Sequence, residues 1–120
     1  MLSEHQKKWI QAIANLIRLT QEKELKWKAK PPPLRLTEDN PRADIMYVTD
    51  FEGQKLYLYE RYFFDHDFFH SPETVLELSN SDGHAAWASP KIEGLDDLLE
   101  AVKYQVIDVN DFLEKILKKK

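Results

Sequence analysis

The residues best suited to chemistry lie in residues 65–70, which read Asp-His-Asp-Phe-Phe-His. In a helix, His66 and His70 would share one face, and Asp65 or Asp67 would complete a metal site with nitrogen and oxygen ligands. The histidines do not enclose the glutamate that an H-E-x-x-H motif supplies. The stretch also follows a predicted strand and precedes Ser-Pro. We therefore expect a solvated loop, with a small metal-dependent hydrolase as the alternative.

Other catalytic arrangements are missing from the sequence. The chain has no cysteine, which excludes thiolate nucleophiles, disulfides and cysteine-type zinc sites. None of its serines stands in a G-x-S-x-G elbow, and its three glycines form no phosphate-binding loop. Asp96 and Asp97, with Glu93 and Glu100 nearby, are better explained as acids at a helix start than as paired catalytic carboxylates. We expect a protein without enzymatic activity and without a cofactor.

One face of the predicted sheet is a candidate interaction surface. Side chains alternate between the two faces of a strand, so five residues of the central strands share one side: Met46, Val48, Tyr57, Tyr59 and Arg61. Tyrosine, methionine and arginine are enriched in protein interfaces. If helices cover only the other face, this face is predicted to bind a partner. If helices cover both faces, the same residues are core, or the tyrosines shield a solvated sheet.

Charge is unevenly distributed along the 120-residue chain, whose net charge is −4. Residues 1–42 have a net charge of +4, residues 43–114 of −12 and residues 115–120 of +4. An acidic body repels a phosphate backbone, so nucleic-acid binding is disfavoured and would depend on residues 23–35 and the lysine tail, residues 118–120. The acidic body is compatible with a basic protein partner, although a solvated acidic surface needs no partner.

Length and composition predict one domain, residues 1–120. With 42% hydrophobic and 12% aromatic residues, the chain has material for a substantial core. Its first residues lack the apolar segment of a secretory signal. No stretch approaches the roughly 18 apolar residues of a membrane span. We expect a soluble, cytoplasmic protein that does not contact a membrane.

The first predicted helix covers residues 3–22. Ser3 and Gln6 have the spacing of a capping box, in which each side chain satisfies a backbone N–H at the helix start. Six residues recur at helical spacing on one face: Trp9, Ile10, Ile13, Leu16, Ile17 and Thr20. Because charges of both signs occupy the opposite face, we expect this helix to pack on a core rather than on a membrane.

Residues 23–42 are predicted to form a basic connector. The prolines at positions 31–33 exclude a helix and favour an extended conformation. We expect Leu25 and Trp27 to dock this segment onto the core.

Residues 45–51 and 55–64 are rich in β-branched and aromatic side chains, which predicts a hairpin of two strands. A turn at Glu52 and Gly53 would pair Thr49 with Leu56 and Tyr47 with Leu58. One face of this ribbon would hold Ile45, Tyr47, Leu56 and Leu58. A second hairpin is predicted by Asp82-Gly83, a common two-residue turn, which would pair Leu78 with Trp87.

Two helices are predicted at the end of the chain. Gly94 precedes the first helix, whose apolar stripe is Leu95, Leu98, Leu99, Val102 and Val106. Asp108 is predicted to cap the second, whose stripe is Val109, Phe112, Leu113, Ile116 and Leu117. The predicted fold is α+β: a four-stranded antiparallel sheet with an N-terminal helix and two C-terminal helices, packed mostly on one face.

Several segments carry a resemblance that covers nearly the whole chain. They are Leu16, Ile17 and Thr20, Leu25-Lys26-Trp27, Tyr57 and Tyr59, Leu76-Glu77-Leu78, Asp82-Gly83, Trp87, Pro90, residues 95–99, residues 102–105, Val109, Phe112 and Leu113. In these segments the chain resembles a group of short, uncharacterised bacterial proteins with an N-terminal helix, a meander and two closing helices. The resemblance implies a fold and no activity, because most of these positions are core, turn or cap residues.

These observations favour a non-catalytic protein-interaction module that binds another protein through its acidic body or its tyrosine-rich sheet face. An antidote or immunity protein acting on a basic toxin would fit, as would an accessory subunit of a larger assembly. The alternatives are the metal-dependent hydrolase and weak nucleic-acid binding. A homo-oligomer is compatible with the sequence.

Overall fold

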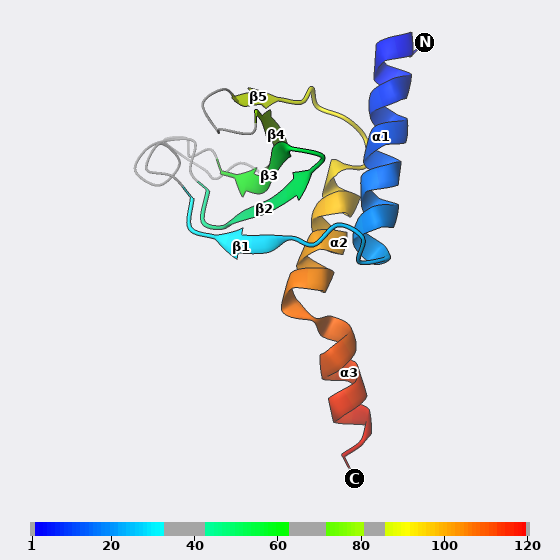
Figure 1. Ribbon diagram of the computed structural model, residues 1–120, viewed down its shortest axis with the longest axis vertical. Coiled ribbons are helices and arrows are strands. Elements are labelled where there is room, and N and C mark those ends of the chain that lie inside the picture. The colour runs from blue at the N-terminus through cyan, green and yellow to red at the C-terminus, as the bar shows by residue number, and fades with distance from the viewer. Residues whose placement is uncertain (1, 33–42, 63–71, 81–85, 120) are drawn as a thin grey trace, which may run out of the picture.

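The computed structural model describes residues 2–32, 43–62, 72–80 and 86–119 (Figure 1). Helix α1 precedes five strands in these residues, and helices α2 and α3 follow them. The strands are β1 (Lys28–Lys30), β2 (Met46–Phe51), β3 (Gln54–Arg61), β4 (Glu73–Ser79) and β5 (Ala86–Ala88). They form one antiparallel sheet in which each strand pairs with the next along the chain. The predicted α+β class and antiparallel meander are confirmed.

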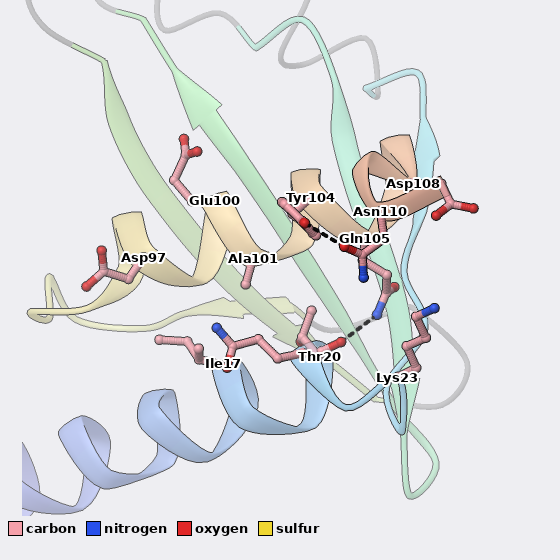
Figure 2. Close-up of a pocket in the computed structure, with 11 residues that line it drawn as sticks. Ile17, Thr20, Lys23, Asp97, Glu100, Ala101, Tyr104, Gln105, Asp108 and Asn110 are labelled. Atoms are coloured by element: carbon pink, nitrogen blue, oxygen red, sulfur yellow. Dashed lines mark hydrogen bonds between the residues drawn. The ribbon is translucent and has the colours of Figure 1, made fainter. Parts of the chain in front are cut away.

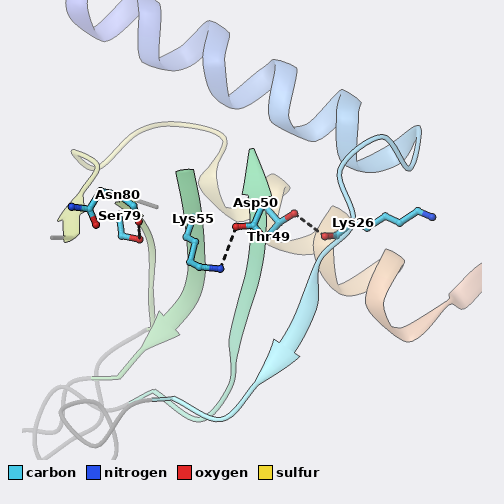
Figure 3. A network of polar contacts seen from close by, with 6 residues as sticks. All are labelled: Lys26, Thr49, Asp50, Lys55, Ser79 and Asn80. Carbon is cyan, nitrogen blue, oxygen red and sulfur yellow. Dashed lines mark hydrogen bonds and ion pairs between the residues drawn. The ribbon is translucent and has the colours of Figure 1, made fainter. Parts of the chain in front are cut away.

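Strand β1 is the addition to the predicted four strands. It belongs to the predicted connector and pairs with the start of β2. All three of its residues are exposed, so it lacks the alternation of apolar and polar residues that indicates a strand. Trp27, only 5% exposed, docks the preceding segment as predicted. The Thr49 hydroxyl also donates to the Lys26 carbonyl at 2.7 Å (Figure 3).

Both predicted strand registers are confirmed. Thr49 faces Leu56 and Tyr47 faces Leu58 across the first hairpin. Glu52 and Gly53 both have positive φ, at 48° and 87°, as a two-residue hairpin turn of this type requires. In the second hairpin Leu78 faces Trp87, as predicted. The Asp82-Gly83 turn itself lies outside the described residues.

Helix α1 (Glu4–Gln21) begins at the predicted capping box. The Gln6 amide donates to the Ser3 hydroxyl at 3.1 Å, and the Ser3 amide donates to the Gln6 side chain at 2.9 Å. Its buried residues are Ile13 and Thr20, which both belong to the predicted apolar stripe. In the first half of α1, the ring of Trp9 stacks on the ring of Trp87, which belongs to β5.

The main core lies between one face of the sheet and the helices α1 and α2 (Figure 1). Its buried residues are Ile13, Trp27, Tyr47, Leu56, Leu58, Leu76, Leu95, Leu98, Leu99 and Val102. Helix α1 contributes Ile13 and α2 contributes its first four stripe residues, while alternate positions of β3 and one residue each of β2 and β4 come from the sheet. Burial of this size is the main stabilising contribution to such a fold.

Helix α2 (Leu95–Ile107) is joined to α3 (Val109–Leu117) by a single residue, Asp108. Asp108 has a left-handed backbone (φ 57°), which ends α2, and its side chain accepts from the Asp111 amide, which caps α3 as predicted. The expectation that both closing helices pack on the sheet is wrong for α3. No residue of α3 is buried. Beyond Asp108 the helix extends away from the sheet (Figure 1), so the described part of the chain places no core opposite its stripe.

Candidate functional site

The five residues predicted as an interaction surface do not form an accessible face. Met46, Val48 and Tyr59 are 5%, 8% and 1% exposed, and they pack with Ala43 and Val75 in a second apolar cluster. Apolar packing on both faces of the sheet therefore removes these three side chains from solvent. Of the two alternatives drawn from the sequence, the one in which these residues belong to the core holds for Met46, Val48 and Tyr59.

The polar ends of this cluster serve the sheet itself. Tyr59 donates its hydroxyl hydrogen to the carboxylate of Glu77 on β4. The Arg61 guanidinium lies 3.2 Å from a carboxylate oxygen of Glu73, its opposite neighbour on β4. Tyr57 is half-buried. These contacts give Tyr59 and Arg61 a structural role in holding β3 to β4.

The predicted metal ligands Asp65, His66, Asp67 and His70 lie outside the described residues. Among the residues that the structure does describe, no group of three or more histidine, aspartate or glutamate side chains gathers as a cation site.

The basic connector is described up to residue 32. Lys28 and Lys30 stand exposed on β1, at the edge of the sheet. Lysines on an edge strand discourage pairing with a strand of another molecule. The position of these two lysines therefore has a structural explanation that does not involve a phosphate backbone.

The site with the shape of a binding site is a groove of about 510 Å³ between α1, α2 and the start of α3 (Figure 2). Volumes of this size are typical of ligand pockets. Its lining comes from three parts of the chain: Ile17, Thr20, Gln21 and Lys23, then Asp97, Glu100, Ala101, Tyr104 and Gln105, then Asp108 and Asn110. We call it the α1–α2 groove.

Gln105 fixes the wall of the α1–α2 groove. Its side-chain amide donates to the Thr20 carbonyl at 2.9 Å (Figure 2). The same amide donates to the Leu25 carbonyl at 2.7 Å, and the side-chain oxygen accepts from the Trp27 amide at 2.8 Å. The Trp27 indole in turn donates to the Thr20 hydroxyl at 3.0 Å. Because this network joins the end of α1 to the end of α2, the groove is formed by rigid elements.

The mouth of the groove is set by two left-handed residues. Lys23 (φ 64°) turns the chain after α1, and Asp108 (φ 57°) turns it after α2. The Tyr104 hydroxyl donates to the side-chain oxygen of Asn110 at 2.8 Å, which holds the start of α3 against α2 (Figure 2). The position of α3 at the groove therefore depends on this contact and on the Asp108 cap.

The groove combines an acidic rim with an apolar floor. Asp97, Glu100 and Asp108 are exposed on the rim, where Lys23 is the one basic side chain of the lining. Asp97 and Glu100 enter no ion pair with the residues that the structure describes. The floor includes Ile17, half-buried, and the ring of Tyr104, 45% exposed. Carboxylates around an apolar surface favour a ligand that carries cationic and apolar groups together.

A smaller hollow of about 230 Å³ lies between α2 and the end of β3. Here the Lys103 ammonium lies 3.2 Å from a Glu60 carboxylate oxygen. Burial by itself lowers the pKa of Lys103, but the hydrogen bond and the charge of Glu60 raise it overall. The pKa of Tyr62 is raised by burial and by the charges of Glu60 and Asp44. The ion pair links α2 to β3.

Two of the groove's acids are predicted from the sequence as acids at a helix start. Asp97 does lie in the first turn of α2, whereas Glu100 lies in the turn that follows. Their place on a rim depends on Ile17 and Lys23, which lie more than seventy residues earlier in the chain. The local feature of the sequence that agrees with a binding site is the presence of Asp97 and Glu100 near an exposed tyrosine, Tyr104.

None of the described helices is long and apolar enough to cross a membrane. We compared the chain with protein-family models, with curated proteins and with solved structures. No match was found in any of the three comparisons.

Proposed function

We propose that this chain is a non-catalytic protein-interaction module that binds a basic, partly apolar segment of another protein in the α1–α2 groove. The observation that carries the proposal is the acidic rim of Asp97, Glu100 and Asp108 over an apolar floor. Apolar contacts in the groove would supply most of the affinity, and the carboxylates would select for lysine or arginine.

The negative charge of the chain around the groove also favours a basic partner. Residues 43–114, which include all of α2, have a net charge of −12. A surface of this charge attracts a basic partner over a distance of about one Debye length and raises the association rate. An antidote that neutralises a basic toxin would use such a site, as would an accessory subunit that holds a basic tail.

The α1–α2 groove is already formed before a partner binds. Gln105 of α2 makes one hydrogen bond to Thr20 of α1 and two to the segment that follows α1, so little ordering of the chain accompanies binding. The polar lining groups closest to the floor are already used in these bonds and in the Tyr104–Asn110 contact. The partner would therefore contact apolar surface at the floor and carboxylates at the rim.

The test uses a defined probe, an amphipathic helical peptide of lysine and leucine, and its counterpart in which glutamate replaces lysine. Calorimetry should detect binding of the lysine peptide alone, and the affinity should fall as the salt concentration rises. The double variant Asp97→Asn/Glu100→Gln should weaken binding by on the order of tenfold.

The matched control is Glu52→Gln/Glu93→Gln, which removes the same charge from exposed positions outside the groove. It should bind the lysine peptide like the unchanged protein. Equal weakening by both double variants would show attraction to net charge and not to the groove. Binding of both peptides with equal affinity would also contradict the proposal.

A further inference from the structure

Lys23 occupies the position after α1 at which helices most often have a glycine. The chain ends α1 with a Schellman motif, in which the Lys23 amide donates to the Thr20 carbonyl at 3.1 Å and the Glu24 amide donates to the Leu19 carbonyl at 2.9 Å. The motif needs a left-handed residue, and Lys23 has a φ of 64°. A residue with a Cβ is strained in this conformation, whereas glycine is not. The lysine therefore indicates a role for its side chain beyond ending the helix.

The Lys23 side chain is exposed and lines the α1–α2 groove at the end where α1 and α2 finish (Figure 2). It forms no ion pair with the part of the chain that the structure describes. Asp108 lines the groove at this same end, so the positive charge of Lys23 offsets its negative charge. At the other end lie Asp97 and Glu100, with no basic residue of the lining beside them. The groove thus has a negative end and a neutral end.

The two ends of the groove are far enough apart to act separately. Asp97 and Asp108 lie about 16 Å apart along the axis of α2. This distance is about two Debye lengths at physiological ionic strength. Each charged group of a bound segment therefore interacts mainly with the end of the groove at which it lies. A lysine or arginine is attracted at the Asp97 end and gains little at the end that contains Lys23.

We propose that Lys23 determines which basic segments the α1–α2 groove accepts, and that it selects those whose basic residues are clustered at one end. The proposal rests on the binding function proposed above and adds the orientation of the ligand. The basic residues of the ligand lie at Asp97 and Glu100, and its apolar, uncharged part lies at the end beside Lys23. A segment with basic residues at both ends would place one of them against the Lys23 ammonium, and this repulsion discriminates against it.

Two peptides of equal composition test this selection by calorimetry. Both are amphipathic helices of leucine, lysine and glutamine, one with all its lysines in one half and the other with lysines at both ends. The unchanged chain should bind the clustered peptide several-fold more tightly than the dispersed peptide. Equal affinities would overturn the role of Lys23 and leave the groove as a binding site. Binding of neither peptide would overturn the proposed function as well.

Charge reversal identifies the residue responsible. Lys23→Glu should bind the dispersed peptide at least as tightly as the clustered one. The matched control is Lys8→Glu, which makes the same change of charge at an exposed position of α1 outside the groove and should keep the original preference. A preference that persists in Lys23→Glu would overturn the proposal. Loss of the preference in both variants would also overturn it, since it would show an effect of net charge.

Lys23→Gly separates a role in binding from a role in the fold. It should reduce the preference for the clustered peptide without lowering the midpoint of thermal unfolding. Relief of the strained backbone should offset the loss of a positive charge at the end of α1. A lower midpoint would mean that the lysine is present for stability, which would overturn the proposal.

Discussion

Helices α2 and α3 follow each other directly and have the same kind of apolar stripe, yet they end in opposite environments. Leu98 and Val102 of α2 are fully buried, whereas Ile116 of α3 is half exposed. The α2 stripe faces α1 and the sheet, while Asp108 turns α3 away from both (Figure 1). Helical periodicity therefore shows which side of a helix is apolar, and the chain geometry at its ends decides what that side meets.

The largest expected effect on stability is the difference between a substitution in the α2 stripe and one in the α3 stripe. Leu98→Ala leaves a cavity in the main core and should lower the free energy of unfolding by about 3 kcal/mol. Ile116→Ala, measured in dilute protein, should cost less than about 1 kcal/mol, because its side chain is already 51% exposed. Urea unfolding of both variants measures the difference. Equal losses would mean that α3 is packed within its own chain.

The polar anchor of α2 should have the next effect. Gln105→Ala leaves the Trp27 amide and the Leu25 carbonyl without their partner, which should cost about 2 kcal/mol. Gln105→Glu keeps the size and the acceptor but loses both donors, so its loss should be similar. A neutral result in thermal unfolding for both variants would show that water replaces these bonds.

Gly94 at the start of α2 and Gly53 in the turn between β2 and β3 form a matched pair of glycines. A Cβ at Gly94 (φ 100°) would lie 3.2 Å from the side chain of Ile13, whereas a Cβ at Gly53 (φ 87°) would meet nothing within 4 Å. Both alanine variants strain the backbone by about 1 kcal/mol. Gly94→Ala should cost a further 1 kcal/mol or so from crowding against α1. Equal unfolding midpoints would show that α1 yields at this contact.

The smallest expected effect is the change of stability at high pH that comes from the groups around the Lys103–Glu60 ion pair. The pKa values of Lys103 and Tyr62 are raised above their ordinary 10.5 and 10.0, so the folded chain holds these protons more tightly than the unfolded chain does. Their stabilisation is complete below pH 10 and is lost as the pH rises through the raised pKa values.

Burial is the main cause of the raised pKa of Tyr62, and the charge of Glu60 adds to it, while Glu60 is the main group that raises the pKa of Lys103. Glu60→Gln should therefore reduce this loss of stability above pH 10, chiefly through Lys103. Asp111→Asn, which breaks the exposed Lys115 pair within α3, is the control and should leave the pH profile unchanged. Stability profiles that coincide for Glu60→Gln and the unchanged protein would contradict this assignment.

Local signals in the sequence predicted local structure well. The capping box at Ser3, the pairing of Thr49 with Leu56 and the cap at Asp108 depend on residues within ten positions of one another. The pairing of Leu78 with Trp87 has the same range. In each case turn geometry and helical spacing are enough to specify the contact.

Features that depend on distant segments were not predicted. The three residues of β1 are all exposed and gave no strand pattern, and their pairing depends on the burial of Trp27. The burial of Met46 and Tyr59 requires apolar partners on the second face, which periodicity alone does not reveal. The α1–α2 groove lies between two helices that all five strands separate in the sequence, so no local pattern indicates it.

Hydrogen–deuterium exchange in dilute protein tests the contrast between α2 and α3 most directly. The amides of α2 should be strongly protected, because α1 and the sheet cover this helix. The amides of α3 should exchange many-fold faster than those of α2, because no residue of α3 is buried. Strong protection of α3 would contradict the account, since it would mean that the helix is covered within its own chain.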